Sequence, residues 1–146
     1  MNNILQIKPL DASNWQLAHG VEQACFGDHC YPDFFFRQAI DAWPTGLVGA
    51  FVDDKLIGYV LCTPGQERDT GWILSVAVLA SQRGVGAGKA LMQHCLQQGY
   101  RQLKLTVAPD NPALGLYQKL GFSETALEHD YFGPGEHRLL MCWHGT

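Results

Sequence analysis

A glycine-rich segment between a predicted strand and a predicted helix is the part of the sequence best suited to hold a ligand. It reads Arg83-Gly84-Val85-Gly86-Ala87-Gly88-Lys89 and follows the apolar run Val76-Ala77-Val78. A turn at the start of a helix leaves backbone N–H groups unpaired, and the positive end of the helix dipole points toward them. Anions, phosphate above all, bind at such helix N-termini. The segment therefore predicts an anion site whose expected ligand is a phosphate group.

Two familiar nucleotide-binding motifs can be tested against this segment by counting residues. A P-loop requires a glycine five positions before its Gly-Lys pair and a hydroxyl residue after the lysine. This chain has Arg83 and Ala90 at those positions, so the motif fails twice. A dinucleotide fingerprint starting at Gly84 requires glycine or alanine where Lys89 stands. Because Asp110 lies near the distance of a ribose-binding carboxylate, a dinucleotide site stays open as an alternative, although the chain has a single convincing strand-helix-strand crossover.

The spacing Arg83-x-x-Gly86-x-Gly88 resembles the pyrophosphate signature of the GNAT superfamily of N-acetyltransferases. A second segment, Asp110-x-x-Ala113-x-x-Leu116-Tyr117-Gln118-Lys119-Leu120-Gly121-Phe122, resembles the family's second cofactor-binding segment. Both segments occur in the family's order and at its usual separation, and the resemblance covers almost the whole chain. Within the superfamily, the pattern is most similar to that of the bacterial ribosomal-protein-type N-terminal acetyltransferases.

The resemblance implies how acetyl-CoA is held as the co-substrate. Main-chain groups of Val76, Ala77 and Val78 would bind the pantetheine arm in a slot, where their strand splays away from the strand over residues 103–107. The residues from Arg83 to Lys89 would bind the pyrophosphate. Asp110 stands where the family usually has asparagine, with Asn111 beside it, so either residue is a candidate for the remaining contact. Taken without the second segment, the glycines would equally suit a tight turn that packs a helix closely.

Tyr117 is the residue to which the resemblance assigns catalysis, as the general acid that protonates the departing thiolate. Its place on the apolar stripe of a helix would also suit a core tyrosine whose hydroxyl group forms a hydrogen bond. The ribosomal-protein-type enzymes carry a glutamate base on the preceding strand, where this chain has Leu105 and Thr106. The general base is therefore unassigned, and Glu67, in the loop before the central strand, is a further candidate.

The missing base bears on which amine accepts the acetyl group. At pH 7, deprotonating a lysine side chain (pKa about 10.4) costs roughly 4–5 kcal/mol, and an α-amine (pKa about 8) costs roughly 1–1.5 kcal/mol. The segment from Glu128 to Met141 also resembles the aromatic hairpin with which N-terminal acetyltransferases cover a peptide. Glu128 could attract a cationic amine, and Tyr131 or Phe132 could line the acceptor site. The charged residues of this segment would also suit an ordinary solvated turn.

The composition indicates a folded chain with apolar residues at 47% and charged residues at 16%. No run approaches the roughly 18 apolar residues of a membrane span, and residues 1–10 lack the pattern of an export signal. A net charge of -4 argues against nucleic-acid binding as the main activity. The five cysteines are odd in number and scattered, which favours reduced thiols in a cytoplasmic protein. Cys25, His29 and Cys30 lack a second pair at zinc-finger spacing, so no metal is expected.

Hydrophobic periodicity predicts the elements that position these residues. They are a strand from Ile4 to Lys8, a helix after a capping box formed by Ser13 and Gln16, a helix Asp33 to Ala42, strands Leu47 to Val52, Leu56 to Cys62 and Trp72 to Val78, a helix from Ala87 to Gln98, a strand Leu103 to Val107, a helix capped by Asn111 with Pro112 next, and strands Phe122 to Tyr131 and His137 to Trp143 around Gly133-Pro134-Gly135. One parallel crossover among hairpins requires a mixed sheet. The expected fold is a single α/β domain over residues 1–146, a GNAT-like mixed sheet of about seven strands flanked by about four helices.

These observations lead us to expect an acetyl-CoA-dependent N-acetyltransferase acting by direct attack in a ternary complex, with a protein or peptide α-amine as the acceptor. Two alternatives stay open: acetylation of a small amine such as a polyamine, amino acid or aminoglycoside, and a catalytically weak CoA-binding regulatory module. The expected partners are acetyl-CoA and the amine acceptor, without nucleic acid or membrane, for a monomer or homodimer. Acceptor identity depends on loops near 28–36 and Gly133, for which no motif exists.

Overall fold

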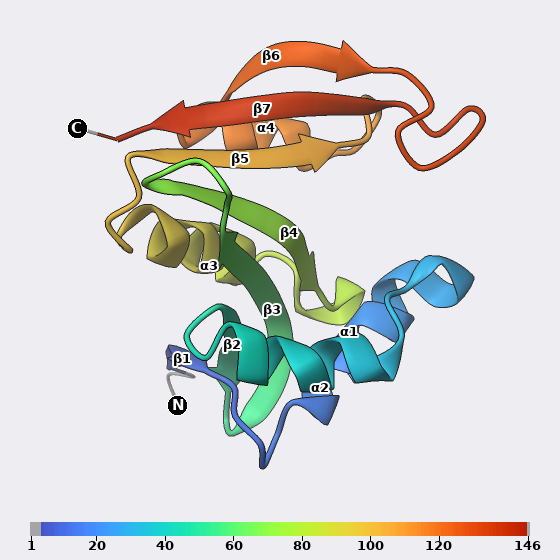
Figure 1. The fold of residues 1–146 in the computed structure, drawn as a ribbon. Helices are drawn as coiled ribbons and strands as arrows, with labels where there is room; N and C mark the ends of the chain where they lie inside the picture. Colours follow the sequence, from blue (N-terminus) through green and yellow to red (C-terminus); the bar gives the residue numbers. More distant parts are fainter. Residues whose placement is uncertain (1–3, 146) are drawn as a thin grey trace. The chain divides into compact units, whose positions relative to one another are not determined.

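The computed structural model describes residues 4–145, which form seven strands and four α-helices (Figure 1). With η for a short 3₁₀ helix, the elements are β1 (Leu5–Pro9), α1 (Gln16–Phe26), η1 (Gly27–His29), α2 (Asp33–Ala42), β2 (Leu47–Val52), β3 (Lys55–Pro64), β4 (Thr70–Val78), η2 (Ala80–Gln82), α3 (Ala87–Leu96), β5 (Gln102–Val107), α4 (Leu114–Lys119), β6 (Ser123–Glu128) and β7 (Arg138–His144). The strand order is β1-β2-β3-β4-β5-β7-β6, and the predicted mixed α/β sheet is confirmed. None of the helices described is long and apolar enough to cross a lipid bilayer.

The chain divides into two compact units. The first comprises the residues up to Thr63 together with Ser75–Cys95, and the second comprises Pro64–Leu74 together with the residues from Leu96 onward. β4 contributes its last residues to the first unit and its first residues to the second. Each unit has its own strand pairing and its own buried side chains.

In the first unit, β1 pairs with β2 and β2 pairs with β3, both antiparallel. Asp53 and Asp54 form the turn between β2 and β3 with φ angles of 51° and 64°. Two consecutive residues with positive φ are typical of the tight turn whose twist matches that of the strands it joins. The predicted hairpin is confirmed, and its turn is shorter than expected because Lys55 already pairs with Val52.

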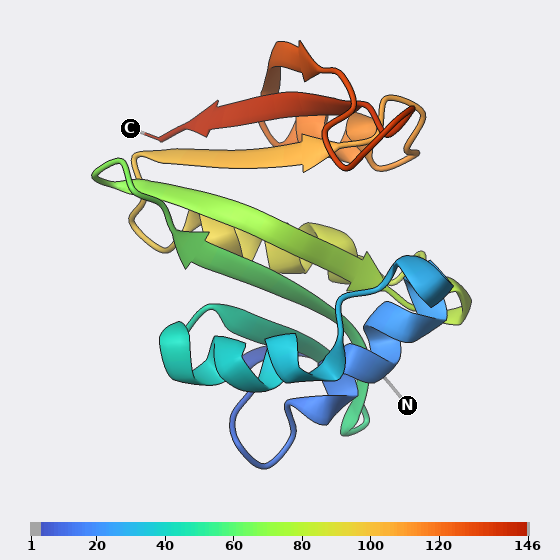
Figure 2. The ribbon, with the colours of Figure 1, turned by 45° about the vertical axis from the view of Figure 1, so that its right-hand side comes forward.

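Helices cover both faces of the first unit's strands (Figure 2): α1 and α2 lie on one face and α3 on the other. The alternation of β3 accounts for this arrangement. Tyr59 meets Phe36 of α2 edge-on, with ring centroids 5.4 Å apart. A Cβ atom on the preceding Gly58 would lie 3.4 Å from Leu91 of α3. Successive residues of β3 thus face opposite helical layers.

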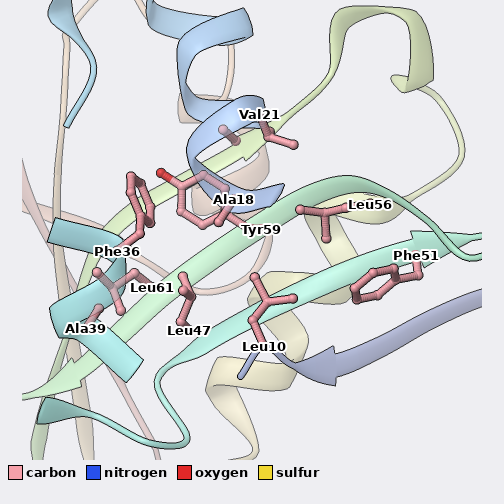
Figure 3. Close-up of a cluster of buried hydrophobic side chains, with 11 residues drawn as sticks. Leu10, Ala18, Val21, Phe36, Ala39, Leu47, Phe51, Leu56, Tyr59 and Leu61 are labelled. Atoms are coloured by element: carbon pink, nitrogen blue, oxygen red, sulfur yellow. The ribbon is translucent and has the colours of Figure 1, made fainter. Parts of the chain in front are cut away.

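The core under α1 and α2 is apolar and closely packed (Figure 3). α2 has the bounds that the sequence predicts, with Phe36 and Ala39 buried and Phe34 62% exposed. Figure 3 shows the contributing side chains between the two helices and strands β2 and β3, namely Leu10, Ala18, Val21, Phe36, Ala39, Leu47, Phe51, Leu56, Tyr59 and Leu61. Burial of this face anchors both helices to the sheet.

The predicted capping box at the start of α1 is wrong. Ser13 does not cap the helix, which begins at Gln16 without a side-chain cap. The carboxylate of Asp11 instead accepts a hydrogen bond from the Ser13 N–H at 2.8 Å, and the Asp11 N–H donates to Asn14 Oδ1 at 2.8 Å. Because Asp11 binds the backbone of Ser13, the chain makes a separate turn before the helix starts.

A carboxyl group lies on the buried face of α1. Glu22 is 2% exposed, and its Oε2 accepts a hydrogen bond from the Tyr31 N–H at 2.9 Å. Its Oε1 accepts hydrogen bonds from the Tyr59 hydroxyl and, at 3.3 Å, from Ser75 Oγ. Tyr59 and Ser75 are themselves within hydrogen-bonding distance at 2.7 Å. Burial, together with the neighbouring Glu22, raises the pKa of Tyr59, so its hydroxyl stays protonated and can donate.

In the second unit, β4 pairs parallel with β5, joining Thr70–Ile73 to Gln102–Leu105. β7 then pairs antiparallel with both β5 and β6. α4 starts at Leu114, later than expected, because Asn111 Oδ1 accepts the Ala113 N–H at 2.8 Å and holds an extra turn before the helix.

β6 is also shorter than expected. The predicted strand continued to Tyr131, whereas β6 ends at Glu128. Asp130 has a φ of 53°, which no extended strand adopts, so the chain leaves the sheet before it. The predicted turn at Gly133 and Gly135 is present, and both glycines have positive φ angles of 135° and 79°.

Replacing Glu22 by alanine should destabilise the protein strongly. The change leaves the donors of Tyr31, Tyr59 and Ser75 without their acceptor and opens a cavity, which we expect to lower the free energy of unfolding by about 3 kcal/mol. Urea denaturation monitored by tryptophan fluorescence measures the change. Gln23→Ala, at the adjacent exposed position of the same helix, is the matched control and should change stability by less than about 0.5 kcal/mol. Equal stabilities for the two variants would contradict the stabilising role of Glu22.

Candidate active site

The glycine-rich segment presents open backbone at the start of α3. Gly84 and Gly86 have φ angles of 100° and 83°, and no atom lies within 4 Å of where a Cβ would stand on either residue. A side chain at these positions would be strained and would fill that open space. Ala90 N–H donates to the Gly86 carbonyl at 3.0 Å, which starts the helix one residue after Gly86. The segment therefore fits a phosphate group that approaches main-chain amides.

The side chains of this segment divide into exposed and buried ones. Arg83 and Lys89 are exposed, as is Val85 at 53%, whereas Ala87 is 2% exposed and packs into the core. Two cationic side chains thus flank the open backbone and can neutralise an anion there. Ala87 can serve a ligand only through its main chain.

The end of β4 is tied to its neighbours in the first unit. Ala77 is 7% exposed and belongs to the core, while Val76 and Val78 are half-buried. The Val78 carbonyl accepts a hydrogen bond from the Cys25 thiol at 3.4 Å. Burial raises the pKa of Cys25, an effect that the nearby Arg83 partly offsets, so the thiol stays protonated and donates. The main chain of Val76 and Val78 remains our predicted contact for the pantetheine arm.

Glu22 and Ser75 are the residues that the sequence analysis missed. Ser75 directly precedes Val76, so its hydrogen bonds to Glu22 and Tyr59 help to fix this part of β4. A signal was present in the sequence: Glu22 lies four residues after the buried Ala18, on the same face of the helix, and directly after the buried Val21. A carboxylate on an apolar stripe of this kind indicates a polar partner inside the core.

Tyr117, on α4, is 6% exposed and packs edge-on against Phe122, with ring centroids 6.2 Å apart. Its hydroxyl group makes no hydrogen bond within residues 4–145, and no fully buried side-chain oxygen or nitrogen there lacks a partner. The hydroxyl group therefore keeps contact with solvent while the ring is buried. Burial raises the pKa of Tyr117 to about 12, so the group is protonated at neutral pH and can donate a proton.

The residues before α4 are candidates for a cofactor contact, and those on β5 stand where related enzymes carry the general base. Asp110 and Asn111 are exposed before α4, and Asn111 Oδ1 already accepts one hydrogen bond in the local turn. On β5, Leu105 is 2% exposed and Thr106 pairs with Leu140 of β7. Neither residue can act as the carboxylate base that the related enzymes carry on this strand.

Glu67 is a poor candidate for the base. Its carboxylate forms an ion pair with Lys104 Nζ at 3.2 Å, and Lys104 also lies 5.7 Å from the ring centre of Trp72. Glu67 precedes the first residue of β4, whereas Val76 and Val78 lie at the other end of that strand. A strand rises about 3.3 Å per residue, which places the two ends of the nine-residue β4 about 26 Å apart.

The residues after β6 present aromatic rings to solvent. Tyr131 is 46% exposed and Phe132 61% exposed, with ring centroids 4.7 Å apart. The Arg138 guanidinium lies 4.9 Å from the centre of the Phe132 ring. Glu128 is exposed at the end of β6, opposite Arg138. Exposed aromatic side chains of this kind are typical of a surface that binds another molecule.

The five cysteines are all free thiols. In the part of the chain that the structure describes, no three histidine, cysteine or acidic side chains gather closely enough to hold a metal ion.

Solved structures share this fold along nearly the whole chain. The crystal structure of Ard1 from Thermoplasma volcanium superposes with a TM-score of 0.87, covering 97% of this chain and 98% of that one at 22% sequence identity. At that identity, the likeness establishes the fold.

Curated relatives share the sequence as well. The chain is 31% identical over 128 residues to an N-alpha-acetyltransferase of Sulfurisphaera tokodaii, covering 77% of each protein. It is 29% identical over 98 residues to the ribosomal protein bS18 alanine N-acetyltransferase of Haemophilus influenzae, covering 62% of this chain and 66% of that enzyme. Residues 10–122 match the sequence model of the acetyltransferase (GNAT) family, and this span includes the glycine-rich segment and Tyr117. The chain therefore belongs to the GNAT acetyltransferase family.

Proposed function

We propose that this GNAT enzyme transfers the acetyl group of acetyl-CoA to the α-amine at the N-terminus of a protein. The observation that carries the proposal is the similarity over 77% of each chain to the N-alpha-acetyltransferase of S. tokodaii. The shorter match to the bS18 enzyme supports the finer proposal that ribosomal proteins are among the acceptors.

Acetyl-CoA supplies an activated acetyl thioester, and the residues of this chain would hold it at two places. Open backbone at Gly84 and Gly86, with Arg83 and Lys89 alongside and Gly88 in the first turn of α3, suits the pyrophosphate. Main-chain groups of Val76 and Val78 suit the amide-bearing pantetheine arm, which can pair with an exposed strand as another strand would. Binding of both parts positions the thioester for attack.

In the proposed reaction, the unprotonated acceptor nitrogen attacks the thioester carbonyl, forming the C–N bond while the C–S bond breaks. The amine releases a proton to water, and the departing thiolate takes a proton from the Tyr117 hydroxyl. Two features of Tyr117 support this role: its hydroxyl group keeps contact with solvent, and burial keeps it protonated with a pKa of about 12.

The acceptor amine must lose its proton without a carboxylate on β5, where Leu105 and Thr106 stand. This favours an α-amine, because its pKa is about 2.4 units lower than that of a lysine side chain. The exposed Tyr131 and Phe132 are proposed to line the acceptor site, and Glu128 is proposed to attract the positively charged form of the amine.

Replacing Gly88 by valine should weaken acetyl-CoA binding without unfolding the protein. Gly88 lies on α3, so valine suits its backbone, but the added methyl groups stand where the pyrophosphate would meet the amides. We expect the affinity for acetyl-CoA to fall by about tenfold or more in a calorimetric titration. Gly20→Val is the matched control, since Gly20 is an exposed residue of α1 with no atom near an added Cβ. Unchanged affinity in Gly88→Val would remove the proposed pyrophosphate site.

Removing the hydroxyl group of Tyr117 should slow turnover while leaving acetyl-CoA affinity nearly intact, because the ring still packs against Phe122. Loss of a general acid typically costs about 10² to 10⁴ in rate, and we expect Tyr117→Phe to lower kcat by that order. With a pKa of about 12, the hydroxyl stays protonated in alkaline buffer, so the ratio of wild-type to variant kcat should stay constant from about pH 7 to about pH 9. A change in kcat below about threefold would contradict the general-acid role and show that Tyr117 serves packing alone.

Peptides that carry both a free α-amine and a lysine should be labelled mainly at the α-amine. At pH 7 the α-amine is unprotonated about two hundred times more often than the lysine side chain. Mass spectrometry of the products locates the acetyl group, and Tyr131→Ala should raise the KM for the peptide. Predominant lysine labelling, or rapid turnover of polyamines or amino acids without peptide labelling, would contradict the proposed acceptor and favour a small-molecule substrate.

A further inference from the structure

The connection between β6 and β7, residues 129–137, is fastened by one aspartate and one histidine. The Asp130 N–H donates a hydrogen bond to His137 Nδ1 at 3.1 Å. Asp130 Oδ1 accepts the Gly135 N–H at 2.8 Å, and the Asp130 carbonyl accepts the Gly133 N–H at 3.1 Å. Asp130 thus joins the two sides of the connection, and His137 is its anchor next to β7.

Asp130 depends on these bonds because of its backbone. Its φ angle of 53° lies in the left-handed region, which residues other than glycine seldom adopt. Such a conformation persists where the surrounding contacts hold it in place. Losing the bond to His137 would therefore free Asp130 to leave this conformation.

Two exposed aromatic residues follow Asp130 directly. Tyr131 and Phe132 pack edge-on against each other, and Arg138 stacks on the Phe132 ring. The Phe132 N–H also donates to the Glu136 carbonyl at 3.4 Å, across the same connection. Because the rings have little core packing, the backbone around Asp130 decides where they point.

We propose that His137 is a positioning residue for acceptor binding: its unprotonated Nδ1 holds Asp130 and thereby presents Tyr131 and Phe132 to the acceptor. This inference rests on the proposed function, in which these two rings line the acceptor site. His137 itself touches neither substrate.

The bond works in one protonation state of the histidine. Nδ1 accepts a hydrogen bond only when the imidazole is neutral with its proton on Nε2. In the imidazolium, Nδ1 carries a hydrogen that faces the Asp130 N–H, so the bond is lost. The atom nearest to the protonated Nδ1 on the Asp130 carboxylate is Oδ1, at 3.8 Å, and this oxygen already accepts the Gly135 N–H. Protonation of His137 removes the acceptor of this hydrogen bond, so acid should loosen the connection.

The other titratable and charged groups around the ring come from the connection and from the strands that it joins. The His129 ring lies edge-on to His137 with centroids 5.1 Å apart, and the Asp130 Oδ1 atom lies 3.8 Å from His137 Nδ1. Glu136 and Arg138 flank His137 in the chain, and Glu128 lies opposite Arg138.

Three variants separate positioning from general effects. His137→Asn keeps an acceptor, Oδ1, in the place of Nδ1 but cannot be protonated. His137→Ala removes the acceptor. His129→Asn is the matched control, because it removes the neighbouring titratable ring and leaves the bond between His137 and Asp130 in place. Both residues lie in the connection between β6 and β7, and circular dichroism should show the same fold for all three variants.

The first readout is the KM for an N-terminal peptide under saturating acetyl-CoA, in neutral and mildly acidic buffer. Dividing each KM by that of His137→Asn at the same pH cancels the protonation of the peptide amine. We expect the wild-type ratio to be about 1 near pH 8 and to rise roughly threefold to tenfold near pH 5.5, with kcat unchanged. The ratio for His137→Ala should be raised by this amount at both pH values, and His129→Asn should follow the wild type.

The second readout is hydrogen exchange of the Asp130 and Gly135 amides, which needs no acceptor. Exchange should be roughly threefold to tenfold faster in His137→Ala than in His137→Asn. Equal exchange in these two variants, or a KM ratio for the wild type that stays at 1 in acid, would overturn the positioning role. If no peptide is acetylated, the proposed acceptor is wrong, and the inference is then decided by the exchange result and by the KM ratio for whichever amine is acetylated.

Discussion

A buried carboxyl group must have its hydrogen-bonding partners inside the protein, and this requirement organises the first unit around Glu22. Its two oxygens gather donors from the loop after α1, from β3 and from β4. Each of these groups would be costly to bury alone, so the helix, loop and strands become ordered together. The segment that follows Ser75 is the one proposed to bind pantetheine, and its position therefore derives from a carboxylate 53 residues away in the sequence.

The candidate functional residues of each unit combine a buried part with an exposed part. Ala77 near the end of β4 and Ala87 at the start of α3 are buried in the core, whereas Gly84 and Gly86 between them leave their backbone open. Tyr117 repeats this division within one side chain, since its ring packs against Phe122 while its hydroxyl keeps contact with solvent. Packing holds each group in place, and the missing or exposed atoms leave room for chemistry.

Local patterns in the sequence predicted the local features of the structure. α2 follows its apolar periodicity, and the hairpin of β2 and β3 follows its two apolar runs. The capping box failed because a nearer competitor, Asp11, binds the Ser13 backbone. Glu22 was missed because its partners Tyr59 and Ser75 lie 37 and 53 residues away, and no short-range pattern encodes such distances. The acetyltransferase function could be predicted because the glycine-rich segment and Tyr117 belong to local motifs. The identity of the acceptor could not be predicted, because it depends on loops that carry no motif.

β6 has a consequence for the behaviour of the protein at high concentration. It is the last strand of the sheet order and every one of its residues is exposed, so it offers unpaired backbone that another chain could extend. Its register shifts between Glu124 and Ala126, and Glu124 and Glu128 place negative charges along the edge. An irregular edge with like charges resists pairing with its own copy, which protects the protein from growing into fibrils through this strand.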